Sequence, residues 1–242
     1  MTNKWLKVAL MVTAIATGTS INIDAETVLY VPQDDRPVSL QYTVDTAREA
    51  GMTVLTPPQY LISGKTYQGQ ADQIMAWVEQ NAGRADVMVL STDTLIYGGL
   101  VDSRKHNIPL STLQNRLKRI EGLKARNKNV RIYGFGTVMR SPRASGGGTE
   151  PAYYAEYGPT IFQIAALQDK LDSGSLTQEE TQKMMSLQAS VPVEYLQDWF
   201  DRRQKNMKIN KELIDETRSG VFDYFALGHD DTSQLSQSAL EG

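Results

Sequence analysis

Four stretches of this chain place charged residues, tyrosine or glycine directly after an apolar run. The candidates are Asp34, Asp35 and Arg36, then Asp93, Tyr97, Gly98, Gly99 and Arg104, then Arg140, and finally His229, Asp230 and Asp231. A carboxylate beside an arginine stays ionised, whereas carboxylates beside one another do not all stay ionised. Such a set can supply one protonated acid and one charged base, which is what glycoside hydrolysis requires.

We therefore assign candidate roles by residue type. The predicted catalytic residues are Asp34, Asp35, Asp230 and Asp231. The predicted substrate-binding residues are Arg36, Asp93, Tyr97, Gly98, Gly99, Arg104, Arg140 and His229. We also expect Arg36 or Arg104 to pair with one of the carboxylates, because the carboxylates would otherwise repel one another.

Each candidate also has a purely structural interpretation. An Asp before Pro37 can cap a helix that begins at the proline. Glycines 98 and 99 are typical of a tight turn as well as of close approach to a ligand. His229 with its two acidic neighbours is a weak metal motif, because adjacent side chains seldom point at one ion. Accordingly, no metal and no cofactor is predicted.

Composition excludes several classes of function. The chain has 242 residues, a formal net charge of −3, no cysteine and two histidines. Without cysteine there is no disulfide scaffold, thiolate zinc site or cysteine nucleophile. Without a basic excess there is no electrostatic basis for binding nucleic acid. We therefore predict a small molecule or a glycan as the partner.

The N-terminus has the pattern of a secretory signal peptide. Lys4 and Lys7 precede a short uncharged apolar run, and Ala25 ends a plausible cleavage site. The apolar run is too short for a stable membrane anchor. We expect residues 1–25 to be removed, and the rest to be periplasmic or extracellular without stable insertion in a membrane.

Five apolar runs predict buried strands, and helical patterns alternate with them. The runs are Thr27–Pro32, Met52–Thr56, Asp86–Leu90, Val130–Phe135 and Phe222–Leu227. Because they are continuous, we expect both faces of the sheet to be covered. Alternation of this kind predicts an α/β domain over 26–242 with parallel strands. It is either a partial (β/α) barrel or a five-stranded doubly wound sheet, with a helical insertion over 141–220. In both architectures the candidate residues gather at the carboxyl ends of the strands.

Four motifs carry a resemblance to a known family. VPQDDRPVSLQY, STDTLIYGGLVDSR, the strand ending in VMR, and YFALGHDDTSQ are similar to the N-terminal half of domain-of-unknown-function family 4127. The resemblance covers about residues 27–235, with mild departures at Gln33 and Thr94. It implies that a C-terminal half is missing from this chain, and it implies no activity.

Three functions remain open at this stage. The first is an exported glycan-directed hydrolase that uses the Asp residues at the strand ends. The second is a non-catalytic protein that binds sugar or cell wall, with Tyr97 as a stacking face. The third is a metal-dependent hydrolase. Turnover of a glycan separates the first from the second, and loss of activity with a chelator identifies the third.

Overall fold

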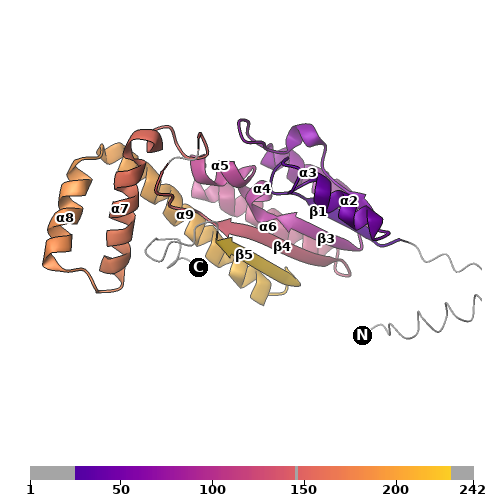
Figure 1. The fold of residues 1–242 in the computed structure, drawn as a ribbon. Helices are drawn as coiled ribbons and strands as arrows, with labels where there is room; N and C mark the ends of the chain where they lie inside the picture. Colours follow the sequence, from indigo (N-terminus) through magenta and orange to yellow (C-terminus); the bar gives the residue numbers. More distant parts are fainter. Residues whose placement is uncertain (1–24, 145–146, 230–242) are drawn as a thin grey trace, which may run out of the picture.

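The computed structural model describes residues 25–144 and 147–229, and these form an open parallel sheet flanked by helices (Figure 1). The strand order is β2-β1-β3-β4-β5, and every neighbouring pair is parallel. The strands are β1 (Thr27–Val31), β2 (Thr53–Leu55), β3 (Val87–Ser91), β4 (Arg131–Val138) and β5 (Tyr224–His229). This confirms the predicted α/β class, and of the two predicted architectures it is the doubly wound sheet.

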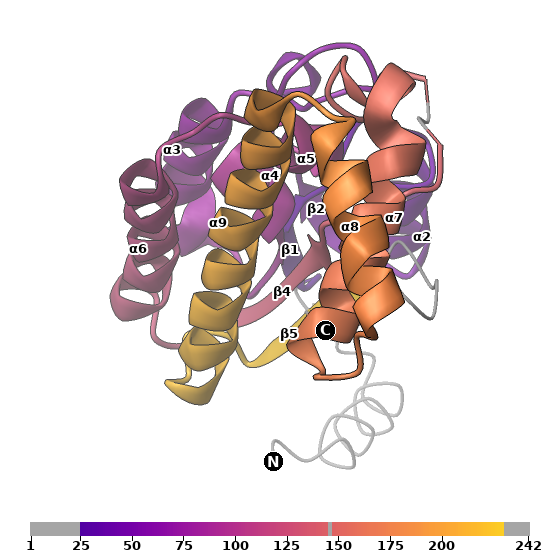
Figure 2. The same ribbon diagram turned by 90° about the vertical axis from the view of Figure 1, so that its left-hand side faces the viewer.

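The helices that flank the sheet are divided unequally between its two faces. They are α2 (Gln41–Glu49), α3 (Ala71–Asn81), α4 (Thr92–Tyr97), α5 (Leu100–Lys105), α6 (Leu110–Arg126) and α9 (Val193–Arg218), with short 3-10 turns η1 (Gln59–Leu61) and η2 (Ala82–Arg84). Helices α3, α6 and α9 lie on one face, and α2 lies on the other (Figure 2). The strand order reverses at β1, so crossovers of one hand place α2 opposite the later helices.

The main core lies between the sheet and the α3, α6 and α9 face. Leu29, Met88 and Ile132 point into it from the strands, and Ile209 and Leu213 point into it from α9. Burial of these apolar side chains is the dominant favourable term in folding. The central strands β1, β3 and β4 are thereby held to one helical layer.

The opposite face of the sheet is only partly covered, so the expectation of two covered faces is wrong for the later strands. Tyr224 is 62% exposed, Ala226 is also exposed, and Tyr133 and Phe135 are half-buried. Among the described crossovers, the one from β1 to β2 runs over this face, and its short helix α2 packs near β2 at one edge of the sheet.

The segment between β4 and β5 contains a helical hairpin and a crossover helix. The hairpin consists of α7 (Tyr154–Asp172) and α8 (Gln178–Ala189). Its side chains form a second core with Trp199 at the start of α9. The later part of α9 packs on the sheet through Ile209. Helix α9, within the predicted insertion over 141–220, therefore contributes to both cores.

Three helices follow β3 before the chain reaches β4. The short helices α4 and α5 come directly after the strand. Helix α6 begins at Leu110 after Pro109, with no side-chain hydrogen bond at its N-cap. Within the described ranges, no helix is both long and apolar enough to cross a membrane.

We predict that Gly134→Ala destabilises the sheet. A Cβ at Gly134 would lie 2.6 Å from the ring of Phe222 and 2.7 Å from that of Phe225. Overpacking of this kind costs about 1–3 kcal/mol. Gly83→Ala is the matched control, because a Cβ at Gly83 has nothing within 4 Å. Urea unfolding measures both variants, and equal unfolding free energies would contradict the packing described here.

Candidate functional site

A cleft of about 550 Å³ opens at the carboxyl ends of the strands. Its described lining is Gln33, Asp34, Arg36, Gly64, Lys65, Leu100, Val101, Arg104, Thr137, Arg140, Thr149, Gly228 and His229. The residues predicted from the sequence that meet here are therefore Asp34, Arg36, Arg104, Arg140 and His229. Asp230 and Asp231, two of the predicted catalytic residues, lie outside the described residues.

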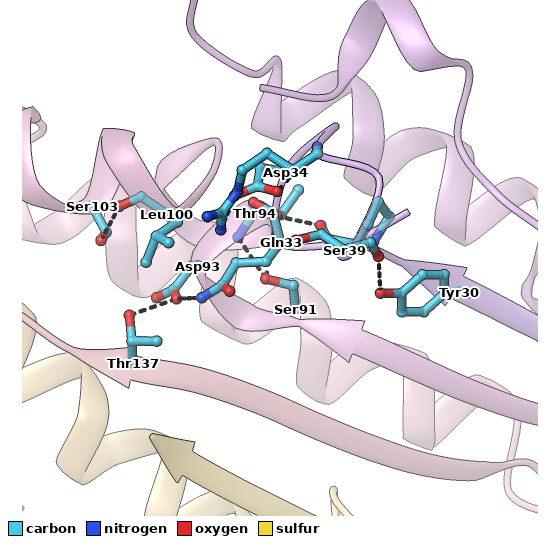
Figure 3. A network of polar contacts seen from close by, with 12 residues as sticks. Tyr30, Gln33, Asp34, Ser39, Ser91, Asp93, Thr94, Leu100, Ser103 and Thr137 are labelled. Carbon is cyan, nitrogen blue, oxygen red and sulfur yellow. Dashed lines mark hydrogen bonds and ion pairs between the residues drawn. The ribbon is translucent and has the colours of Figure 1, made fainter. Parts of the chain in front are cut away.

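Asp93 lies beneath the floor of this cleft. It is 2% exposed, and its Oδ2 accepts hydrogen bonds from Gln33 Nε2 at 2.9 Å and Thr137 Oγ1 at 2.8 Å (Figure 3). Burial raises the pKa of Asp93 to about 6. The hydrogen bonds that it accepts and the nearby charge of Arg104 lower the pKa, but by less than burial raises it. Gln33 and Thr137 line the cleft, whereas Asp93 does not. The sequence suggested direct substrate contact, but Asp93 instead holds the two side chains that form the floor.

The residues on either side of Asp93 tie the start of α4 to the neighbouring strands. Thr92 Oγ1 donates to the carbonyl of Phe135 on β4 at 3.1 Å, and Thr94 Oγ1 donates to the carbonyl of Pro32 after β1 at 2.6 Å (Figure 3 labels Thr94). Ser91 caps the helix by accepting from the Thr94 amide. Three consecutive side chains therefore fix the exits of β1, β3 and β4 relative to one another.

Asp34 and Arg36 form an ion pair at the rim, which confirms the expected pairing. Arg36 Nε lies 2.8 Å from Asp34 Oδ2, and the Arg36 amide lies 3.2 Å from Asp34 Oδ1. The Asp34 side chain is 7% exposed and that of Arg36 is 53% exposed. The carboxylate is thus held in one orientation, while the guanidinium remains accessible to solvent.

Asp35 binds the loop of residues 63–69 at the rim of the cleft. Its side chain accepts a hydrogen bond from the Tyr67 hydroxyl, and its amide donates to the Ser63 carbonyl at 2.9 Å. This hydrogen bond raises the pKa of Tyr67, because it favours the protonated phenol. Asp35 therefore anchors a loop at the rim and is not among the described lining residues.

Tyr97, Gly98 and Gly99 have structural roles, and none of them is in the described lining of the cleft. Tyr97 is buried, and its ring stacks on His106 with centroids 4.9 Å apart, so the predicted stacking face is wrong. Gly98 ends α4 at φ 112°, a backbone conformation that favours glycine. A Cβ at Gly99 would lie 1.8 Å from Ser63 Oγ. The absence of side chains lets the 63–69 loop pack directly on these residues.

Arg140 is held by a buried acid that sequence reasoning missed. Its Nε donates to Glu150 Oε1 at 2.9 Å, and Glu150 is 2% exposed. Arg203 supports the same region by donating to the Met139 carbonyl at 2.8 Å and to Ser141 Oγ at 2.9 Å. In the sequence Glu150 lies two residues after a run of three glycines, 146–148. A lone acid beside such a segment is a weak signal, although its partner Arg140 lies only ten residues earlier in the same segment after β4.

The described residues do not gather into a metal centre. No group of three or more His, Asp or Glu side chains within 25–144 and 147–229 could hold an ion. The cleft instead presents four cationic side chains, Arg36, Lys65, Arg104 and Arg140, beside the carboxylate of Asp34. This lining suits hydrogen bonding to a polar or acidic ligand.

We predict a pH-dependent effect of Asp93→Asn on stability. The Asp93 carboxyl binds its proton more tightly in the folded chain than in the unfolded chain. Its protonated form therefore favours folding at acidic pH, and this contribution is lost as the pH rises from about 4 through 6. Asn does not titrate, and each pKa unit corresponds to about 1.4 kcal/mol, so the free energy of unfolding of the variant should rise by up to about 3 kcal/mol relative to wild type between pH 4 and 8.

Urea unfolding at several pH values measures this difference, with Asp45→Asn on exposed α2 as a control. A stability difference between Asp93→Asn and wild type that stays constant from pH 4 to 8 would contradict the raised pKa.

The comparisons with known proteins give one family. No curated protein and no solved structure matches the chain. The family model described as "Protein of unknown function (DUF4127)" matches residues 28–242. The chain therefore belongs to the DUF4127 family.

Proposed function

We propose that the cleft at the carboxyl ends of the strands binds a sugar or a glycan fragment. The observation that carries this proposal is the joint presence of Asp34, Arg36, Arg104 and Arg140 in one lining, contributed by separate strand exits. Carboxylate and guanidinium groups are planar and form paired hydrogen bonds, which suits adjacent hydroxyls on a ring. A volume of about 550 Å³ is in the usual range for a small-molecule site.

The binding groups are arranged before any ligand arrives. Asp34 is paired with Arg36, Arg140 with Glu150, and the floor residues Gln33 and Thr137 are bonded to Asp93. Side chains that are already ordered lose little entropy when a ligand binds. This supports recognition of a ligand with fixed geometry, such as a pyranose ring.

Hydrolysis of the bound glycan is the second candidate. It requires two carboxyl groups that flank the scissile bond. Asp34 is the carboxylate in the described lining, and Asp230 and Asp231 directly follow His229, which also lines the cleft. In this proposal Asp34 and either Asp230 or Asp231 supply the two catalytic carboxyl groups, and Asp35 has the anchoring role described above.

Export remains part of the proposal. Export directed by residues 1–25, the predicted signal peptide, would place the cleft where cell-wall or extracellular glycans occur. Both the binding and the hydrolytic forms of the proposal use this location.

Asp34→Asn and Arg104→Lys should each weaken glycan binding by residues 26–242. Both changes keep the approximate size of the side chain but remove a paired hydrogen-bonding group, and such bonds contribute about 1.5–3 kcal/mol, which corresponds to roughly tenfold or more in affinity. A glycan array followed by calorimetry measures this. Arg218→Lys is the control, because Arg218 lies exposed at the end of α9. Equal affinity in all four proteins would place the ligand elsewhere.

Asp230→Asn and Asp231→Asn separate binding from hydrolysis. If the protein is a hydrolase, at least one of these variants should lose turnover by about 100-fold or more while it still binds the glycan, since general acid catalysis contributes 10²–10⁴-fold. Release of reducing ends measures turnover. Glycan binding without any turnover by the wild-type chain would leave the non-catalytic form of the proposal.

A further inference from the structure

We infer that the ligand of the cleft is an acidic sugar, whose ring stacks on Tyr67 and whose carboxylate pairs with Lys65. This inference rests on the proposed glycan function and names the class of sugar. Neither residue stood out in the sequence, because the loop of residues 63–69 carries no strand-exit signal. The structure brings this loop to the rim.

Tyr67 lies between two segments that line the cleft. Its hydroxyl donates to Asp35, which lies between the lining residues Asp34 and Arg36. Its ring lies over Gly64, another lining residue, and a Cβ at Gly64 would be 2.5 Å from ring carbons of Tyr67. Tyr67 is nevertheless 49% exposed. An aromatic surface is therefore presented to solvent at the rim, with the position of the ring set from both sides.

The loop that carries Tyr67 is fixed by hydrogen bonds at several points. The Gly64 amide donates to the Tyr67 carbonyl at 3.1 Å, and the Gly69 amide donates to Asp102 Oδ2 at 3.1 Å. Close packing of Gly69 on Gly98 leaves no room for a side chain at position 69. An aromatic ring on such a loop provides contact area at little entropic cost, which is the property of rigid aromatic anchors in binding sites.

A ring of this kind suits a sugar better than it suits a flexible or flat polar ligand. A pyranose has an apolar face of C–H groups and a rim of hydroxyls. The apolar face can cover the Tyr67 ring, while the hydroxyls reach the carboxylate and guanidinium groups in the cleft. Burial of an aromatic face contributes through the apolar area that is removed from water.

Lys65 supplies the charge preference. It lines the cleft and is exposed, and a Cβ placed at Gly147 would lie 3.9 Å from Lys65 Nζ. The ammonium group therefore extends across the mouth toward the segment that contains Thr149, another lining residue. Lysine ammonium groups attract carboxylates as point charges, and the effect is greater in a cleft than on an open surface. A sugar that stacks on Tyr67 would have its carboxylate within reach of this group.

The test uses residues 26–242 and two probes of matched size, a hexuronic acid disaccharide and the corresponding neutral hexose disaccharide. Calorimetry should show that wild type prefers the acidic probe by roughly fivefold or more, as expected for one ion pair in a partly screened site. Lys65→Gln should abolish this preference. Equal affinity of wild type for both probes, or no binding of either, would overturn the inference.

Tyr67→Ala should weaken binding of both probes by roughly three- to tenfold, because aromatic stacking contributes about 0.5–1.5 kcal/mol beyond area burial. Tyr67→Phe keeps the ring but removes the bond to Asp35, so it should bind more tightly than Tyr67→Ala. Tyr42→Ala is the matched control, since Tyr42 is a 62% exposed tyrosine on α2, outside the 63–69 loop.

These variants separate failure of the inference from failure of the proposed function. If Asp34→Asn loses binding and Tyr67→Ala does not, the cleft binds the sugar but the stacking role of Tyr67 is wrong. If Tyr67→Ala and Tyr42→Ala lose binding equally, the effect is not specific to the rim and the inference also fails. A glycan array on which no sugar binds would remove the proposed function itself.

Discussion

The arrangement of the strand ends depends on one buried carboxylate. Asp93 sits at the start of α4 and accepts hydrogen bonds from Gln33 after β1 and from Thr137 on β4. Its neighbours Thr92 and Thr94 bond to the backbone of the same two strand exits. An unsatisfied carboxyl would be costly in this buried position, so the three exits must stay where these bonds can form. The shape of the cleft above follows from that requirement.

The reversal of strand order at β1 accounts for the asymmetry of the molecule. Parallel strands require crossovers, and crossovers of one hand place the helices of the two halves on opposite faces. The half that contains β3, β4 and β5 sends its helices to one face, where the main core forms. Helix α9, which connects β4 to β5 and packs in this main core, also contributes Trp199 to the second core. One long helix thereby connects the sheet to the α7–α8 hairpin.

The charged rim is ordered by pairing, and the pairing differs from residue to residue. Asp34 is held by the adjacent Arg36, whereas Arg140 is held by Glu150 from a segment rich in glycine. Asp35 is held by Tyr67 and so ties the 63–69 loop to the first strand exit. Groups that could interact with a ligand are therefore also structural. A site built in this way is rigid, which favours selectivity for ligands of one shape.

Much of this arrangement could be predicted from local sequence patterns. Apolar runs indicated all five strands, and the shared polarity of their exits placed Asp34 and Arg140 at one edge, because parallel strands end on the same side. Strand order, and with it the choice between barrel and open sheet, depends on pairing between distant segments and could not be predicted locally. The direction of each side chain was equally beyond the sequence: Tyr97 points into the core and Tyr67 out to the rim. The physical reason is that local periodicity reports which residues are buried, whereas the partner that each residue meets is decided only when distant strands and loops come together.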